Sequence, residues 1–138
     1  MSDSLLLDTH ILLWILLEPN KIPEAVKLQI ESAQADNKLM ISSISLWEIA
    51  VLKYKKRINI YEPIKDFLES IVKIEGMSVV EISAEIAAES IMLLDNFHND
   101  PADRIIVASA RCTGAVLVTK DQKILDWAKL GHLKVLGV

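Results

Sequence analysis

A strongly apolar stretch near the N-terminus determines how this chain folds: Leu5-Leu6-Leu7-Asp8-Thr9-His10-Ile11-Leu12-Leu13-Trp14-Ile15-Leu16-Leu17. Its apolar pattern predicts a buried strand at 5–7 that leads straight into a helix at 9–17. One carboxylate, Asp8, lies at the join. A charge in so apolar a run is costly to desolvate unless a partner stabilises it. Asp8 is therefore the first candidate for a functional residue.

The 138-residue chain has the composition of a folded globular protein. Hydrophobic residues make up 51% of it, and no repeat or long linker divides it, so we expect a single domain over residues 1–138. Four glycines and four prolines are few for an all-β fold. The net charge of −4 gives no overall basic surface, so binding to a nucleic acid would need a local basic patch and a metal ion at any acidic site.

The cysteine content and the N-terminus indicate where the protein works. The single cysteine, Cys112, excludes an internal disulfide and fits a reducing cytosol. Residues 1–4 contain no basic segment of the kind that begins a secretory signal. The apolar run 5–17 is too short to span a bilayer and is interrupted by Asp8 and His10. We therefore expect a cytoplasmic protein that has no membrane partner.

Helical and strand-like segments alternate along the chain, which is typical of an α/β fold with a largely parallel sheet. We expect strands at 5–7, 39–41, 78–82, 115–118 and, at an edge of the sheet, 133–136. We expect helices at 9–17, 23–35, 45–56, 63–74, 83–94, 101–113 and 121–129. The predicted order is therefore β-α-α-β-α-α-β-α-α-β-α-β.

Three further acids occupy joins comparable to that of Asp8, namely Glu48, Asp103 and Asp121. Asp8 follows the first strand and Asp121 the fourth, so both lie at the carboxyl edge of a parallel sheet, where ligands bind. Glu48 lies early in the helix after the second strand, and Asp103 lies in the first turn of the helix that Pro101 opens. Both share a helical face with apolar residues, which predicts that their side chains point inward.

Each acid also has a purely structural interpretation. The aspartates that precede predicted helices could cap them, namely Asp8, Asp100 and Asp121. Glu48 could be the return half of a capping box that Ser45 opens, and Asp103 could take that part opposite Asp100. We expect Asp100 to be a cap. Four acids at one rim are harder to explain as caps alone, and we favour a shared site for the others.

The four acids carry charges that a divalent cation would offset. Closely packed carboxylates repel one another, and one of them takes up a proton unless a cation lies between them. Oxygen ligands without a Cys or His cluster favour Mg²⁺ or Mn²⁺ over Zn²⁺. Such ions generate hydroxide from bound water and stabilise the oxygens of an in-line phosphoryl displacement. The pattern therefore predicts a metal site suited to phosphodiester cleavage, with the number of ions left open.

Four short segments resemble the motifs of the PIN domain, in particular those of VapC-type ribonuclease toxins from bacterial toxin–antitoxin pairs. They are Leu6-Leu7-Asp8-Thr9-His10, residues 42–50 with Trp47-Glu48, Asp100-Pro101-Ala102-Asp103-Arg104 and Thr119-Lys120-Asp121. The resemblance covers nearly the whole chain, with all four segments in order and at family-like spacing. It implies that the metal-binding and catalytic residues are Asp8, Glu48, Asp103 and Asp121, supported by the hydroxyls of Thr9 and Thr119.

The resemblance also implies a fold, an activity and partners. The fold would be a PIN-like α/β domain with a mostly parallel five-stranded sheet flanked by helices. The activity would be that of a Mg²⁺- or Mn²⁺-dependent endoribonuclease, and the protein would be a homodimer inhibited by a small antitoxin. Two alternatives are a non-catalytic PIN-like RNA-binding or interaction module and an aspartyl phosphotransferase with Asp8 as nucleophile. Clustered acids disfavour the first, and His10 in place of a second acid disfavours the second.

Several residues near these motifs have two interpretations each. We interpret His10 as a helix-start residue and His98 as a loop residue, with a supporting role in the site as the alternative. A basic cluster ends the helix that carries Glu48 and comprises Lys53, Lys55, Lys56 and Arg57. It is either a solvated tail that the helix dipole favours or a patch that contacts phosphates. Trp14 and Trp47 are expected in the core or at a dimer interface.

Overall fold

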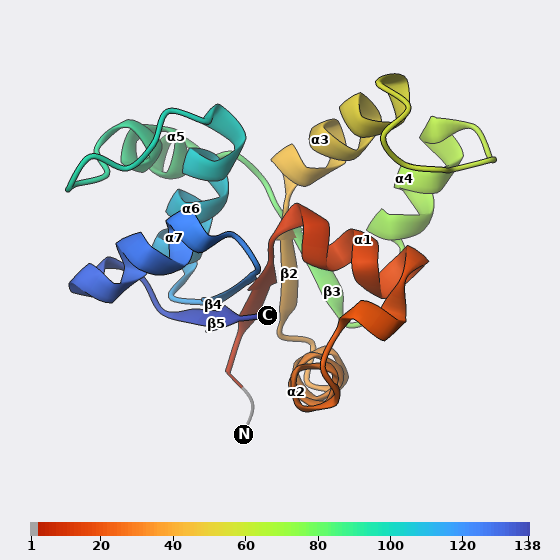
Figure 1. The fold of residues 1–138 in the computed structure, drawn as a ribbon, viewed down its shortest axis with the longest axis horizontal. Coiled ribbons are helices and arrows are strands. Elements are labelled where there is room, and N and C mark those ends of the chain that lie inside the picture. Colours follow the sequence, from red (N-terminus) through yellow and green to blue (C-terminus); the bar gives the residue numbers. More distant parts are fainter. Residues whose placement is uncertain (1–2) are drawn as a thin grey trace.

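The computed structural model describes residues 3–138, which form a five-stranded sheet flanked by helices (Figure 1). The strands are β1 (Leu5–Leu7), β2 (Leu39–Ser42), β3 (Met77–Val80), β4 (Val116–Thr119) and β5 (Val135–Gly137). The helices are α1 (Thr9–Leu17), α2 (Glu24–Ala35), α3 (Ser43–Tyr54), α4 (Ile64–Val72), α5 (Ala84–Ile91), α6 (Pro101–Thr113) and α7 (Gln122–Trp127). A 3₁₀ turn, η1 (Pro19–Lys21), follows α1, and a π-helical turn, η2 (Ala128–His132), follows α7. This order confirms the predicted succession of strands and helices.

The sheet has the strand order β3-β2-β1-β4-β5, and all four pairings are parallel. In the central strand β1, Leu7 is in register with Ile41 on one side and with Val118 on the other. A parallel sheet covered on both faces needs strands that are apolar throughout, and the Leu5–Leu7 run meets that need. The predicted α/β fold with a largely parallel sheet is therefore confirmed.

The core has two parts, one on each face of the sheet. Leu5 and Leu7 pack with buried side chains of α1, α2, α3 and α4, whereas Leu6 packs with those of α6 and α7. Figure 1 shows the two helix groups on opposite sides of the strands. Because successive side chains of a strand point to opposite faces, β1 anchors both halves of the core.

The start of α3 differs from its predicted place. The Ser42 hydroxyl accepts a hydrogen bond from the Ile44 backbone N–H at 3.2 Å and caps the helix, which therefore begins at Ser43. Ser45, the expected cap, lies inside the helix and is buried. The predicted capping box of Ser45 and Glu48 is therefore wrong. Ser42, the last residue of β2, is the N-cap instead, and it lies three residues before Ser45 in the sequence.

Two further observations concern apolar residues. Trp47 is 60% exposed, so it lies outside the core and its place at a dimer interface stays a prediction, while Trp14 is half-buried. Trp47 lies on the outer face of α3, whereas Ile49 lies on the buried inner face.

Among residues 3–138, no helix has both the length and the apolar character that crossing a lipid bilayer requires.

Candidate metal centre

The carboxyl edge of the sheet holds a cavity of about 380 Å³ that is lined mainly by acids. The strands β1 and β2 lead directly into α1 and α3 (Figure 1), and β4 leads into α7, so these helices begin at the same edge. The cavity is lined by Asp8, His10, Glu48, Asp100, Asp103, Lys120 and Asp121. All four acids of the predicted site thus lie around one cavity. The positive ends of helix dipoles favour carboxylates near such helix starts.

Asp8 lies at the junction of β1 and α1 and is only 5% exposed. Its Oδ1 accepts a hydrogen bond from the Thr9 backbone N–H at 2.8 Å, which caps α1, and its Oδ2 accepts one from the Thr119 hydroxyl at 2.6 Å. The Asp8 backbone N–H donates to the Val118 carbonyl at 2.9 Å. Burial raises the pKa of Asp8, and the hydrogen bonds from Thr119 and Thr9 partly offset that effect. The residue therefore caps a helix and also faces the cavity.

Thr119 connects two of the acids across the end of β4. While its hydroxyl donates to Asp8, the same oxygen accepts a hydrogen bond from the Asp121 backbone N–H at 3.0 Å. Asp121 Oδ1 in turn accepts from the backbone N–H groups of Lys123 and Ile124, at 2.8 and 3.4 Å, and caps α7. The capping interpretation of Asp121 is thus confirmed together with its place in the cavity wall.

Glu48 is half-buried in α3 and is held by a side chain from α1. The Thr9 hydroxyl donates to Glu48 Oε1 at 2.5 Å, and the Ser45 hydroxyl lies 2.8 Å from the same Thr9 oxygen. Burial, followed by the negative charges of Asp8 and Asp103, raises the pKa of Glu48 to about 7. Ser45 was missed as a site residue because it was assigned to a helix cap. Its spacing of three residues from Glu48 places both on one helical face and could have revealed it.

Asp103 is paired with a histidine from the loop before α6. Its Oδ2 lies 2.7 Å from His98 Nε2, and its backbone N–H donates to Asp100 Oδ1 at 3.0 Å. Asp100 is therefore the N-cap of α6, as expected. Burial is the largest cause that raises the pKa of Asp103 to about 6, and the nearby charges of Asp8, Asp100 and Asp121 add to it. The structure places His98 at the site, which was only the alternative interpretation from the sequence.

The loop that carries His98 is held by Arg104. The Arg104 guanidinium donates to the backbone carbonyls of Ser90, Phe97 and His98 at 3.0, 2.6 and 2.9 Å. The Phe97 ring is buried and stacks on the His98 ring with centroids 4.4 Å apart. The imidazole is thereby fixed from its backbone and from its ring face, so that Nε2 reaches Asp103.

The donor set suits a hard divalent cation. Within residues 3–138, one ligand atom each from His98, Asp103 and Asp121 lies within 4.8 Å of the others. The raised pKa values of Glu48 and Asp103 show that the site disfavours its own negative charge, which a bound cation would offset. Carboxylate oxygens fit Mg²⁺ or Mn²⁺, and the single imidazole nitrogen is compatible with Mn²⁺. His10 lines the cavity but is exposed.

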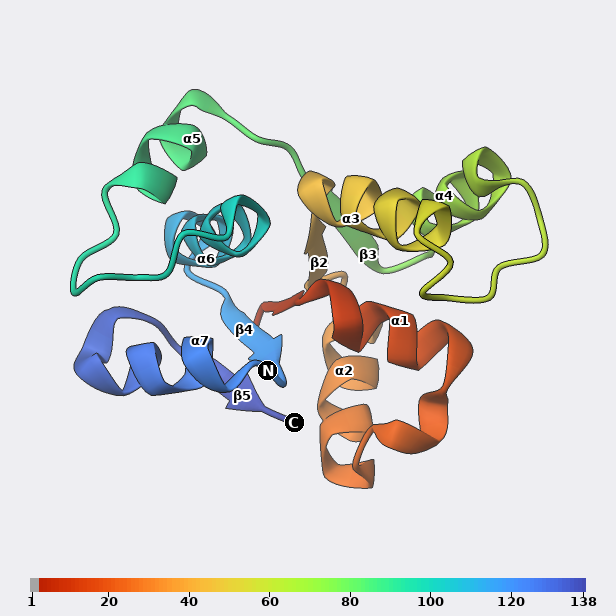
Figure 2. The same cartoon turned by 45° about the horizontal axis from the view of Figure 1, so that its top comes forward.

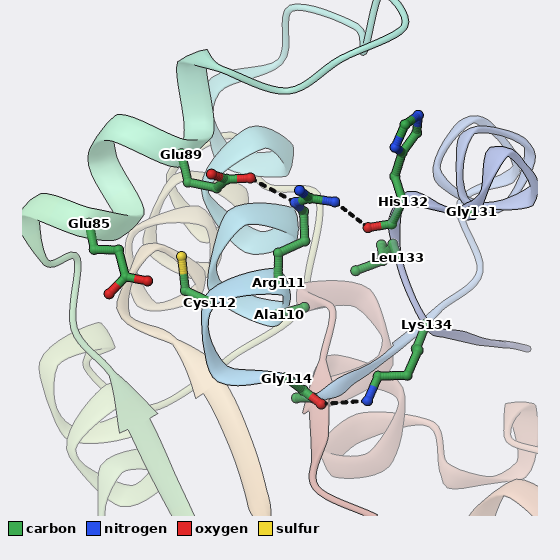
Figure 3. A pocket seen from close by; sticks show the side chains of 11 residues that line it. Glu85, Glu89, Ala110, Arg111, Cys112, Gly114, Gly131, His132, Leu133 and Lys134 are labelled. Atoms are coloured by element: carbon green, nitrogen blue, oxygen red, sulfur yellow. Dashed lines mark hydrogen bonds and ion pairs between the residues drawn. The ribbon is translucent and has the colours of Figure 1, made fainter.

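A separate hollow of about 480 Å³ lies at the opposite end of α6 from the acids, and its lining differs from theirs. Figure 3 shows that three of its charged side chains, Glu89, Arg111 and Lys134, already have partners. Arg111 pairs with Glu89 at 2.7 Å and donates to the His132 carbonyl, while Lys134 donates to the Gly114 carbonyl at 2.9 Å. Since Glu89 is paired with Arg111, Glu85 is the one acid of the lining without an ion pair among the described residues, and we assign no metal site to this hollow.

Comparison with known proteins agrees with this arrangement. The family model described as "PIN domain" matches residues 5–130. Ribonuclease VapC22 of Mycobacterium tuberculosis is 35% identical over 121 residues, which cover 88% of this chain and 89% of that protein. The chain therefore belongs to the PIN-domain family.

Solved structures show the same fold at lower identity. A toxin–antitoxin complex from Klebsiella pneumoniae contains a chain that is 24% identical, with 96% of both chains covered and a TM-score of 0.64. VapBC2 from Rickettsia felis, bound to a DNA fragment from its promoter, gives 20% identity, coverage of 96% and 97%, and a TM-score of 0.67. VapBC-1 from nontypeable Haemophilus influenzae gives 17% identity, 96% coverage of both chains and a TM-score of 0.69.

Proposed function

We propose that this protein is a metal-dependent endoribonuclease and the toxin of a toxin–antitoxin pair. The observation that carries the proposal is the convergence of Asp8, Glu48, Asp103 and Asp121 on one cavity, with pKa values raised at the first three. Such a set of acids has little use without a cation, and a divalent cation held by carboxylates suits phosphodiester hydrolysis. The family membership and the likeness to Ribonuclease VapC22 favour RNA as the substrate.

The roles of the residues follow from their contacts. Asp8, Glu48, Asp103 and Asp121 would hold Mg²⁺ or Mn²⁺, which when bound supplies hydroxide at neutral pH and offsets charge on the phosphate. The hydroxyls of Thr119 and Thr9 fix the directions of the Asp8 and Glu48 carboxylates through the hydrogen bonds described above. His98 orients Asp103 in the same way. Partners of this kind typically sharpen the affinity of a metal site.

The contacts of Asp8 argue against the aspartyl phosphotransferase. A carboxylate nucleophile needs an oxygen that is free to attack and accessible to the substrate. In this protein Asp8 Oδ1 accepts a hydrogen bond from the Thr9 backbone N–H, and Oδ2 accepts one from the Thr119 hydroxyl. The residue is 5% exposed. Each oxygen keeps a second lone pair that a small cation in the cavity can reach, so we assign Asp8 to metal binding and do not retain the nucleophile.

The partners and the cellular setting are part of the same proposal. We infer that residues 1–138 act as one PIN domain in the cytoplasm, as a homodimer that a small antitoxin inhibits. The structural relatives described above include toxin–antitoxin complexes, which supports this inference. The C-terminal end of α5 and the residues after it expose Ile91, Met92 and Leu94 at 75%, 67% and 65%. A cluster of exposed apolar side chains is typical of a surface that a partner covers.

The experiment that tests the function is cleavage of a long mixed-sequence RNA transcript. We expect the wild type to cut the transcript with Mg²⁺ or Mn²⁺, to stop in EDTA and to recover when Mn²⁺ is restored. Asp103→Asn should reduce the rate at least about 100-fold, because a metal ligand is lost while the helix cap by Asp100 remains. Cleavage that persists undiminished in EDTA would reject the mechanism, and binding without any cleavage would favour the non-catalytic module.

A further inference from the structure

A second cavity adjoins the acidic one along α1. It has a volume of about 580 Å³ and lies between α1 and residues 52–59 of α3 and the loop after it, a loop that Figure 2 shows beside α1. His10, in the first turn of α1, lines both cavities. A strand whose phosphate lies at the acids would therefore pass His10 as it enters this cavity.

The lining of this cavity suits a nucleotide better than a charged or fully apolar group. Leu13, Leu52 and Ile58 offer apolar surface to the flat face of a base, and Asn59 offers an amide that can donate and accept hydrogen bonds at its edge. The one acid in the wall, Glu18, is already paired with Lys21 at 2.9 Å. The cavity thus presents no unpaired negative charge to an approaching phosphate.

Two cations lie where the backbone of such a strand would pass. Arg57 lines the second cavity, and Lys120 lines the acidic one. The Lys120 ammonium lies 5.0 Å from the ring centre of Trp14, which itself lines the second cavity. Among residues 3–138, Lys120 forms no ion pair although the acids share its cavity, so its charge is free to meet a phosphate.

The four members of the basic cluster at the end of α3 differ in their contacts and in whether they line a cavity. The Lys53 ammonium already donates a hydrogen bond to the Glu62 backbone carbonyl, at 2.5 Å. Lys55 and Lys56 are exposed and line neither of the two cavities. Arg57 is the member of the cluster that lines the cavity beside the acids.

We propose that the cavity between α1 and residues 52–59 is the RNA subsite next to the metal centre, with Lys120 holding the phosphate at the acids and Arg57 holding the strand beyond it. The base of that nucleotide lies against Leu13, Leu52 and Ile58. This proposal rests on the proposed ribonuclease function. Trp14 acts as a positioning residue, since its ring holds the Lys120 ammonium by a cation–π contact.

The test measures the binding of a fluorescein-labelled 12-nucleotide single-stranded RNA of mixed sequence, with Ca²⁺ in place of Mg²⁺ or Mn²⁺ so that the acids hold a cation, and a gel checks that the RNA stays intact. We expect Lys120→Ala and Arg57→Ala each to weaken binding about 5- to 30-fold at low salt. Each should also lower the salt slope of log K by about 0.7, the value for one phosphate contact on a single strand. Trp14→Leu should weaken the wild type but add little to Lys120→Ala, because its effect passes through that lysine.

The control is Lys134→Ala, which also removes one positive charge. Lys134 contacts Gly114 at the C-terminal end of α6 (Figure 3). This helix is about 20 Å long and has Asp103 in its first turn. We expect this variant to bind RNA with the wild-type affinity and salt slope. An abasic nucleotide in the RNA should weaken wild-type binding about 10-fold, because the base loses its stacking surface.

The subsite and the ribonuclease function fail in different ways. If the wild type cuts RNA with Mn²⁺ but Lys120→Ala and Arg57→Ala bind RNA as tightly and with the same salt slope, the subsite is overturned and a protein segment is the better occupant of the cavity. If the wild type cuts no RNA in any metal, the ribonuclease function is overturned by that result alone.

Discussion

Two threonine hydroxyls set the directions of two of the four acids. Thr119 donates to Asp8 at 2.6 Å, and Thr9 donates to Glu48 at 2.5 Å. Both threonines are buried, so neither hydroxyl can exchange its carboxylate partner for water. Threonine is β-branched and therefore stiff about χ1, which keeps each hydroxyl at its carboxylate. Each acid is thus held in direction before any cation arrives.

The variant Thr9→Val keeps the shape of the side chain and removes the hydroxyl. We expect it to weaken Mn²⁺ binding about 10-fold or more, because Glu48 loses the partner that orients it. It should also lower the free energy of unfolding by about 1–3 kcal/mol, because Ser45 loses its partner in a buried place. Thr9→Ser should keep most of both properties. Calorimetric titration and urea unfolding check this, and equal Mn²⁺ affinity in wild type and Thr9→Val would contradict it.

The raised pKa values of the acids make the stability of the metal-free protein depend on pH. Burial and mutual repulsion raise the pKa of Asp103 to about 6 and that of Glu48 to about 7. The folded state therefore binds more protons than the unfolded state between about pH 4 and pH 7. In that window the contribution of these acids to stability is full at low pH and is lost as the pH rises.

We expect Asp103→Asn to stabilise the metal-free protein at pH 8 by about 1–3 kcal/mol, because it removes a charge that the site disfavours. At pH 5 the difference from wild type should shrink, since the wild-type carboxyl is then largely protonated. Urea unfolding in EDTA at the two pH values measures both effects. Asp66→Asn, at an exposed acid in the first turn of α4, is the control and should change stability by only a few tenths of a kcal/mol. A destabilised Asp103→Asn at pH 8 would show that the wild-type charge is already compensated.

At the scale of elements, the site is built where several helices begin. Asp8, Asp100 and Asp121 each cap a helix with one oxygen, and these caps bring α1, α6 and α7 to the carboxyl edge of the sheet. The loop before α6 supplies His98, and Arg104 holds that loop through two of its backbone carbonyls and ties it to α5 through a third, that of Ser90. The position of His98 therefore depends on contacts made one turn into the next helix.

Replacing Arg104 by Lys keeps the charge and removes the fork of donors. We expect Arg104→Lys to lower the free energy of unfolding by about 2–3 kcal/mol, because partly buried carbonyls lose their partner. Mn²⁺ affinity should fall with it, since His98 no longer orients Asp103. His98→Ala should weaken Mn²⁺ binding with a smaller loss of stability. Urea unfolding paired with calorimetry separates the two variants, and an Arg104→Lys protein with wild-type stability would contradict this role.

Two glycines with positive φ make a matched pair for testing backbone packing. Gly76 has φ +78°, and a Cβ added there would lie 2.1 Å from the Gln34 carbonyl oxygen. Gly114, the C-cap of α6, has φ +71° with no atom within 4 Å of an added Cβ. We expect Gly114→Ala to cost about 1 kcal/mol of stability and Gly76→Ala clearly more, about 3 kcal/mol or higher. Thermal unfolding measures both, and equal losses would show that the contact with Gln34 is unimportant.

Residues with a local signal in the sequence could be placed from the sequence, and those that depend on packing could not. The Leu5–Leu7 strand, the caps at Asp100 and Asp121 and the succession of elements follow from local pattern. His98 could not be placed, because its position depends on Arg104 and on the stacked Phe97 ring. Nothing in the local sequence specifies which strands become neighbours, so the order β3-β2-β1-β4-β5 had to come from the structure.

For the molecule as a whole, charge is the main constraint on function. The chain has a net charge of −4, and its cavity collects five acids against one lysine and one histidine. An RNA strand would be repelled from such a place unless a cation lay at the acids and basic side chains lay beside them. Lys120 and Arg57 supply the second condition on one side of the cavity. The first condition is the claim on which everything else depends.

Calorimetric titration of Mn²⁺ into EDTA-treated, desalted protein at pH 7 tests that claim most directly. We expect saturable binding with release of protons, because Glu48 with a pKa of about 7 gives up its proton when the cation arrives. Asp103→Asn should bind at least about 10-fold more weakly, whereas Lys134→Ala should bind as the wild type does. Absence of saturable Mn²⁺ binding, or equal affinity in wild type and Asp103→Asn, would contradict a metal centre formed by the four acids.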